Sequence, residues 1–207
     1  MKSKNMKILI SNNVPLSNEV EIIRFFFKNK NNLFHLRRYD SSEDDVVQFL
    51  NAFNEEERKQ LVLNHHHFLA SEFGINRLHF SENERLEIGD EKLEKLHSLG
   101  FNLSTSVHSV EDFEKLNSVF EYAFLSPVFD SISKENYKAV SFDLNEVRKD
   151  IKVIALGGIT FENYNDALNL GFDGVAFLGG VWNQENSGLI LSNLVSLLEV
   201  GLRELKS

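Results

Sequence analysis

The chain has 207 residues, of which 42% are hydrophobic, and its formal net charge is -9 at pH 7. This length allows a full hydrophobic core within a single domain, and the absence of cysteine excludes disulfides, thiolate metal sites and a cysteine nucleophile. The acidic balance argues against a nucleic-acid partner, and no apolar run approaches the ~20 residues of a membrane span. We therefore expect one cytoplasmic domain over residues 1–207, with a loosely held N-terminus at residues 1–6.

Short apolar runs alternate with segments of helical spacing along the chain. Strands are predicted at residues 7–11, 33–37, 61–63, 77–80, 101–106, 121–125, 153–156 and 174–178. Helices are predicted at residues 20–27, 43–53, 67–73, 90–99, 110–116, 164–170 and 189–205. Strands and helices in this alternation predict a single (β/α)8 TIM barrel with short loops, an α/β fold; an open doubly wound sheet is the alternative.

The stretch from residue 153 to residue 180 has the order strand, glycine pair, helix, strand, glycine pair. The two pairs, Gly157-Gly158 and Gly179-Gly180, directly follow predicted strands at the carboxyl end of a parallel sheet. Backbone N–H groups at glycines can approach an anion without a Cβ in the way. The pattern therefore predicts a phosphate cradle, although tight connections between strands and helices would give the same residues.

The residues that follow the predicted strands are unusually polar, and a barrel places its chemistry at that edge. The candidate site residues are Arg37, Asn64, His66, His79, Glu84, Ser106 and His108, and the long loop after the sixth strand adds Ser131, Ser133 and Lys134. Because an unpaired arginine at the end of a buried strand is costly, Arg37 predicts an anionic partner. His79 can equally be a hydrogen-bonded core histidine.

Several of these segments resemble the motifs of thiamine phosphate synthases. The segment SPVFDSISK at residues 126–134 resembles the Gly-Pro-Val-Phe-x-Thr-x-Thr-Lys loop of that family. Further similarities, in the same order along nearly the whole chain, are HLRR at 35–38, LVLNHHHFLASEFGINRLHF at 61–80, STSVHS at 104–109 and the glycine pairs at 155–180. The superfamily also includes a thiazole tautomerase (TenI) branch.

The resemblance implies that the chain joins hydroxymethylpyrimidine diphosphate to thiazole phosphate and releases pyrophosphate with the help of Mg2+. The implied partners are phosphorylated small molecules, and a homodimer is possible. The thiazole phosphate would bind at Gly157, Gly158, Gly179 and Gly180. The diphosphate would bind at Arg37, Ser106, Ser131, Ser133 and Lys134, with Asn64 near it. Donors and cations of this kind stabilise a leaving pyrophosphate without a covalent nucleophile.

Departures from the family pattern concern the metal. His65 and Glu84 stand where the family has two metal-binding aspartates, so a Mg2+ site would be degraded, with Glu84 as its weak candidate ligand. Tyr39 replaces a family lysine. Two alternatives therefore stay open. One is a metal-free tautomerase that uses His66, His79 or His108 for proton transfer, since Pro127 occupies the position of that branch's histidine. The other is a binding protein for a phosphorylated thiazole, without catalysis.

Overall fold

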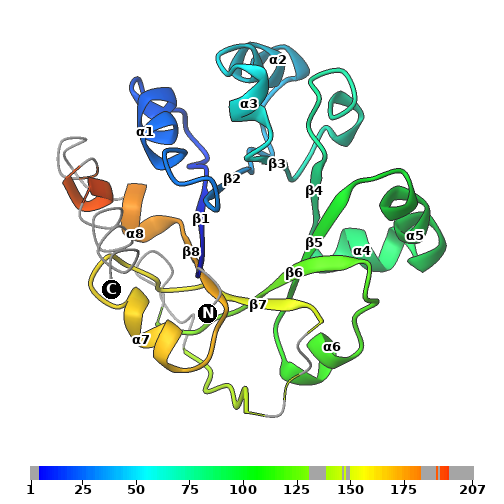
Figure 1. Ribbon diagram of the computed structural model, residues 1–207, viewed down its shortest axis with the longest axis vertical. Coiled ribbons are helices and arrows are strands. Elements are labelled where there is room, and N and C mark those ends of the chain that lie inside the picture. The colour runs from blue at the N-terminus through cyan, green and yellow to red at the C-terminus, as the bar shows by residue number, and fades with distance from the viewer. Residues whose placement is uncertain are drawn as a thin grey trace.

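A computed structural model describes residues 5–130, 139–145, 147, 150–182, 190 and 192–195. In this part of the chain, eight parallel strands form a closed barrel in sequence order, and helices surround it (Figure 1). The barrel confirms the predicted (β/α)8 fold and excludes the open sheet. Among the described residues, no helix is long and apolar enough to cross a membrane.

The strands are short and close to their predicted positions. They are β1 Met6–Ile10, β2 Leu33–Leu36, β3 Leu61–Leu63, β4 Arg77–Phe80, β5 Asn102–Val107, β6 Phe120–Leu125, β7 Lys152–Ala155 and β8 Gly174–Phe177. Ile8 of β1 pairs with Leu33 of β2 on one side and with Ala176 of β8 on the other, which closes the barrel. Because β2 ends at Leu36, Arg37 is the first residue beyond the strand.

The described helices are mostly short. They are α1 Glu19–Phe26, α2 Glu43–Asn51, α3 Glu55–Arg58, the 3-10 helix η1 His67–Leu69, α4 Glu82–Ile88, α5 Asp90–Ser98, α6 Val110–Glu114, α7 Tyr164–Asn169 and α8 Gly179–Trp182. Ser42 caps α2 by accepting a hydrogen bond from the backbone N–H of Asp45, and Ser109 caps α6 in the same way at Asp112.

Three helical segments differ from the sequence prediction. The predicted helix at 67–73 is only a single 3-10 turn, which starts after His66. Helix α4 was not predicted, because its turns bury no residue and leave no apolar stripe to read. The acidic segment Glu55–Arg58, for which no helix was predicted, is a short helix capped by Asn54. Most of the closing helix predicted at 189–205 lies outside the described residues.

The core follows the two-residue alternation of the strands. On β1, Ile8 and Ile10 point into the barrel and belong to its inner apolar cluster, while Leu9 joins the outer cluster that packs against the helices. On β2 the inner positions are Leu33 and His35. His35 is thus a fully buried polar residue inside the barrel. The same alternation assigns Arg37 to the inner side, just beyond the end of the strand.

Candidate active site

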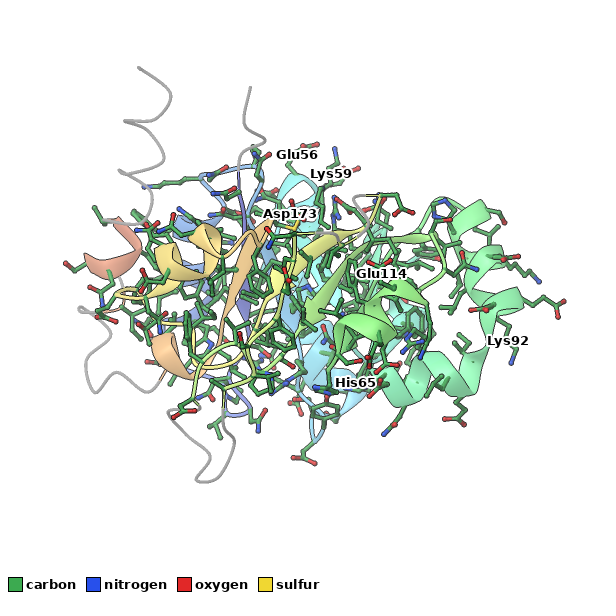
Figure 2. All side chains as sticks on the ribbon, turned by 90° about the horizontal axis from the view of Figure 1, so that it is seen from below. Glu56, Lys59, His65, Lys92, Glu114 and Asp173 are labelled. Carbon is green, nitrogen blue, oxygen red and sulfur yellow. The ribbon has the colours of Figure 1, made fainter. Side chains whose placement is uncertain are left out.

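A pocket opens at the carboxyl ends of the strands. Its lining comprises Ile10, Arg37, Tyr39, Asn64, His65, His79, Ser81, Glu84, Ser106, Phe124 and Leu156. Five of these, Arg37, Asn64, His79, Glu84 and Ser106, were predicted as site residues. Strand alternation explains the grouping, because Asn64, His79 and Ser106 lie at inward positions at or just beyond the ends of their strands. Figure 2 shows His65 at the opposite edge of the barrel from Glu56 and Lys59.

Arg37 is held by its backbone, and its guanidinium forms no ion pair with a carboxylate among the described residues. The backbone N–H of Arg37 donates a hydrogen bond to Ser11 Oγ at 2.9 Å. The Nε atom is buried and has no hydrogen-bond partner within the described part of the chain. The guanidinium carbon lies 5.8 Å from the centre of the Tyr39 ring. A buried donor without a partner is costly, so this site favours an anionic ligand.

The neighbouring Arg38 has a different role. It is buried on the outer side of the barrel, where its guanidinium forms an ion pair with Glu19 of α1 and lies 5.0 Å from the Phe49 ring. Burial raises the pKa of Glu19, and the charge of Arg38 opposes that effect. Arg38 is therefore a structural cation that joins α1 to the barrel, whereas Arg37 remains available to a ligand.

Asn64 is positioned from inside the barrel. Its amide Oδ1 lies 3.0 Å from His35 Nδ1, and His35 Nε2 lies 2.7 Å from the hydroxyl of Tyr122. Burial lowers the pKa of His35 to about 3, so the ring is neutral at pH 7. With Nδ1 facing an amide oxygen, the proton is on Nδ1, and it donates to Asn64. This arrangement leaves the amide NH2 group of Asn64 for the pocket.

His79 and Ser106 form a second pair in the pocket floor. His79 Nδ1 lies 3.0 Å from Ser104 Oγ, and Nε2 lies 3.2 Å from Ser106 Oγ. Burial lowers the pKa of His79 well below its usual value, and the nearby His35 ring contributes in the same direction. His79 therefore matches the hydrogen-bonded core histidine that the sequence allowed, and it orients the hydroxyl of Ser106.

The positions expected to bind a metal are occupied by His65 and Glu84. The Oε2 atom of Glu84 accepts hydrogen bonds from the backbone N–H and the hydroxyl of Ser81, at 2.8 and 2.5 Å, which caps α4. The Oε1 atom lies 3.5 Å from His65 Nδ1. The described residues contain no group of three His, Asp, Glu or Cys side chains that could hold a metal ion. These donors do not fit Mg2+, which prefers hard oxygen ligands in octahedral geometry.

The other two candidate histidines are not among the residues that line this pocket. His66 has a left-handed backbone, with φ of 53°, and its Nε2 lies 3.3 Å from the carbonyl of Ser41. His108 Nδ1 lies 3.1 Å from the carbonyl oxygen of Ser126, to which it donates. The structure thus brings only His79 of the three predicted proton-transfer histidines into the pocket.

The two glycine pairs lie side by side but differ in conformation. Gly157 and Gly158 have φ values of 96° and 65°, and a Cβ on Gly158 would lie 2.5 Å from the carbonyl oxygen of Asp130. The second pair is not a turn: Gly179 and Gly180 are the first residues of α8. A Cβ on Gly180 would collide with the carbonyl oxygen of Ile159, so close packing of the segments after β7 and β8 requires glycine there.

The loop after β6 is described only at its two ends. Its first residues continue beside β7, where the N–H groups of Val128 and Phe129 donate to the carbonyl oxygens of Leu156 and Gly157 at 3.0 and 3.1 Å. The predicted phosphate-binding residues Ser131, Ser133 and Lys134 lie outside the described residues.

Four residues gain importance that the sequence did not assign to them. Tyr39 and His65 line the pocket, although the sequence indicated them only as replacements of family residues. The signal was present, because both lie within three residues of the carboxyl end of a strand. The roles of His35 and Tyr122 had no comparable signal, since their mutual contact joins strands that are far apart in the sequence.

Comparisons with known proteins point to one family. A family profile described as thiamine monophosphate synthase matches residues 8–181. The thiamine-phosphate synthase of Leptospira biflexa is 34% identical over 94 residues, which are 41% of this chain and 44% of that protein, so the match spans less than half of the relative. The Clostridium botulinum (strain 657) enzyme of the same name is 24% identical over 143 residues, 67% of this chain and 68% of that protein.

Solved structures share the fold. The thiamine phosphate pyrophosphorylase of Pyrococcus furiosus superposes with a TM-score of 0.71 at 17% identity and covers 97% of this chain and 98% of its own. The protein of the same name from Bacteroides thetaiotaomicron gives 0.68 at 21% identity, with coverages of 95% and 98%. At these identities the similarity establishes the barrel and not the reaction.

Proposed function

Because the chain belongs to the thiamine monophosphate synthase family, whose profile covers residues 8–181, we propose that it forms thiamine phosphate. The substrates are hydroxymethylpyrimidine diphosphate and thiazole phosphate, and the second product is pyrophosphate. The family places the protein in thiamine biosynthesis with phosphorylated small-molecule substrates. The reaction itself is the part that we propose for this chain.

The observation that carries this proposal is the guanidinium of Arg37. Its buried Nε lacks a hydrogen-bond partner among the described residues, and the same pocket contains Asn64 and Ser106. Guanidinium, amide and hydroxyl donors that converge on one pocket suit the oxygens of a diphosphate. Stabilisation of charge on a departing pyrophosphate is the main task in this chemistry, and fixed donors perform it without reorganisation.

The proposed reaction consists of one bond that breaks and one that forms. The C–O bond between the pyrimidine methylene and the diphosphate breaks, and its electron pair leaves with pyrophosphate. The thiazole nitrogen then donates its lone pair to the methylene cation, and the new C–N bond makes the ring a thiazolium. This nitrogen carries no proton to be removed, so no general base is needed. Burial lowers the pKa of His79 in the pocket and of His35 behind it, so both rings are weak bases, which agrees with this requirement.

The glycine pairs support a place for the second substrate. We assign the thiazole phosphate to the region of Gly157, Gly158, Gly179 and Gly180, where the segments after β7 and β8 adjoin. Ser131, Ser133 and Lys134 complete the diphosphate site in this proposal. Since the described donors do not fit Mg2+, no step in the proposed reaction passes through a metal ion.

Assembly and location complete the proposal. We propose that the protein works in the cytoplasm and as a homodimer, as the family resemblance implies. Sedimentation velocity of the purified chain gives the oligomeric state directly, and a single species with the 23.8 kDa mass of one chain would exclude the dimer.

A comparison of two variants tests the proposed function. Arg37→Ala is expected to reduce the rate of pyrophosphate release from the two substrates by at least tenfold, because one charge-assisted hydrogen bond to the leaving group is lost. Lys59→Ala is the matched control, since Lys59 is an exposed cation at the opposite edge of the barrel (Figure 2). Equal rates of pyrophosphate release in both variants would contradict a role of Arg37 in the reaction.

The two alternatives make different predictions. A tautomerase would catalyse proton exchange on a thiazole carboxylate phosphate, and one of His66→Asn, His79→Asn or His108→Asn would abolish it. A binding protein would hold thiazole phosphate without turnover of any substrate pair. Pyrophosphate release that requires both substrates separates the proposed synthase from each of them.

A further inference from the structure

We propose that this pocket binds the pyrophosphate group without a divalent cation, and that His65 is a substrate-binding residue that donates a hydrogen bond to it. The inference rests on the proposed function, and it concerns how the charge of the leaving group is held. It follows from a contrast within the pocket: oxygen atoms that could bind a metal are already engaged, while nitrogen donors that could bind an anion are not.

The carboxylate and amide oxygen atoms of Glu84 and Asn64 in the pocket all face protein partners. Glu84 Oε2 accepts two hydrogen bonds from Ser81 and so closes the cap of α4. Asn64 Oδ1 accepts from His35 Nδ1 at 3.0 Å. The remaining carboxylate oxygen, Glu84 Oε1, faces His65 at 3.5 Å. A divalent cation would have to displace the cap of α4 at Glu84 Oε2 and the His35 contact at Asn64 Oδ1, and it would meet the His65 ring at Glu84 Oε1.

The nitrogen donors are in the opposite situation. Arg37 Nε and His65 Nε2 are both buried, and neither has a hydrogen-bond partner in the described ranges. Both residues line the pocket, and both lie near the ring of Tyr39. The centre of this ring is 4.2 Å from the centre of the His65 ring and 5.8 Å from the guanidinium carbon of Arg37. Tyr39 thus holds the two donors in one neighbourhood.

Glu84 faces one ring nitrogen of His65 and leaves the other to the pocket. Its Oε1 atom lies 3.5 Å from Nδ1, and the buried Nε2 atom has no hydrogen-bond partner among the described residues. An imidazolium between Glu84 and a phosphate oxygen would donate to both, through Nδ1–H on one side and through Nε2–H on the other.

Electrostatics separates the two kinds of ligand. The described lining residues include one fixed cation, Arg37, and one carboxylate, Glu84, whose Oε1 atom faces His65 Nδ1 at 3.5 Å. A divalent cation entering this pocket meets the guanidinium and gains at most one free carboxylate oxygen. Pyrophosphate meets the same guanidinium as an attractive partner. The pocket therefore favours free pyrophosphate over pyrophosphate that is bound to a divalent cation.

Calorimetric titration with inorganic pyrophosphate tests this inference, because it does not depend on turnover. The wild-type protein is expected to bind pyrophosphate in excess EDTA with nearly the affinity that it shows in Mg2+. Arg37→Ala and His65→Ala are each expected to weaken binding in EDTA about tenfold or more. Lys59→Ala is expected to leave it unchanged. The melting temperature of each variant checks that the fold is intact.

His65→Asp is the sharper variant, since it exchanges the donor for a carboxylate. It is expected to lose pyrophosphate binding in EDTA and to regain part of it when Mg2+ is added. Wild-type binding that occurs only with Mg2+, or in neither condition, would overturn the inference. Unchanged affinity in His65→Ala would overturn the role of this residue. Thiamine phosphate formation is measured separately: product that appears only with Mg2+ keeps the proposed function and contradicts metal-free binding.

Discussion

The ring nitrogen Nδ1 of His35, buried inside the barrel, lies 3.0 Å from the amide oxygen of Asn64 at the pocket. The contact fixes which end of the amide faces the pocket and links a pocket residue to the barrel interior. Burial of the same ring has a consequence for stability, because between about pH 3 and pH 6.5 His35 is neutral in the folded protein and cationic in the unfolded chain.

The stability of the protein is therefore expected to fall as the pH decreases below neutral. Burial lowers the pKa of His35 from 6.5 to about 3, so between these values the unfolded chain binds a proton that the folded chain does not. Each such group reduces the free energy of unfolding by up to about 1.4 kcal/mol per pH unit in that window. His35→Gln removes the group, and its stability should decline less steeply by about that amount. Urea unfolding at pH 7, 6 and 5 measures the two slopes, and parallel slopes would contradict the assignment.

Arg37 and Arg38 are adjacent in sequence, but their substitution by alanine is expected to have different effects. Arg38→Ala leaves Glu19 buried without its cation, which should lower the free energy of unfolding by about 3–5 kcal/mol. Arg37→Ala removes no ion pair of the described structure, so it should leave stability nearly unchanged and reduce pyrophosphate binding. Chemical denaturation and calorimetry on both variants check this separation. A destabilised Arg37→Ala protein with normal binding would make Arg37 the structural cation and contradict its role in the pocket.

Gly158 is expected to tolerate no side chain. Gly158→Ala places a Cβ 2.7 Å from Phe129 Cβ and forces the loop after β6 away from the segment after β7. The change should cost about 1–3 kcal/mol of unfolding free energy and weaken thiazole phosphate binding. Gly74→Ala is the control, since Gly74 has nearly the same φ, 66°, and its Cβ would meet no atom within 4 Å. Equal losses in the two variants would attribute the effect to backbone strain alone.

The single tryptophan offers a direct signal for the second substrate. Trp182 is buried on α8, two residues after Gly180, and its Nε1 donates to the carbonyl oxygen of Ile10 at 2.5 Å. Thiazole phosphate bound at the glycine pairs should change the emission of this indole in a saturable way. An emission spectrum that stays constant while calorimetry records binding would move the thiazole phosphate away from α8.

The barrel could be predicted because its strands are buried and short. A short apolar run between polar connections, such as 61–63, favours a buried strand, and the observed bounds of β3 and β4 agree with the prediction. Helix α4 was missed although Ser81 and Glu84 have the spacing of a capping box, since Leu86 is exposed and provides no amphipathic pattern. The sequence thus predicted the strands, which bury apolar residues, more readily than a surface helix such as α4, which buries none.

The candidate site could be predicted in part for the same reason. Carboxyl strand ends meet at one edge of a barrel, which suffices to bring Arg37, Asn64 and Ser106 together. The sequence could not reveal that His66 bonds to the carbonyl of Ser41, or that Gly179 starts a helix, because these depend on contacts between distant segments and on local backbone angles. The replacement of a family aspartate by His65 was visible from the start, but its meaning depended on the position of Glu84.

Mass spectrometry of a reaction with purified protein, hydroxymethylpyrimidine diphosphate and thiazole phosphate is the strongest test of the proposed function. The expected result is thiamine phosphate and pyrophosphate in equal amounts, formed only when both substrates are present and at a much lower rate with Arg37→Ala. Binding of both substrates by the folded protein without any thiamine phosphate, in Mg2+ or in EDTA, would contradict it.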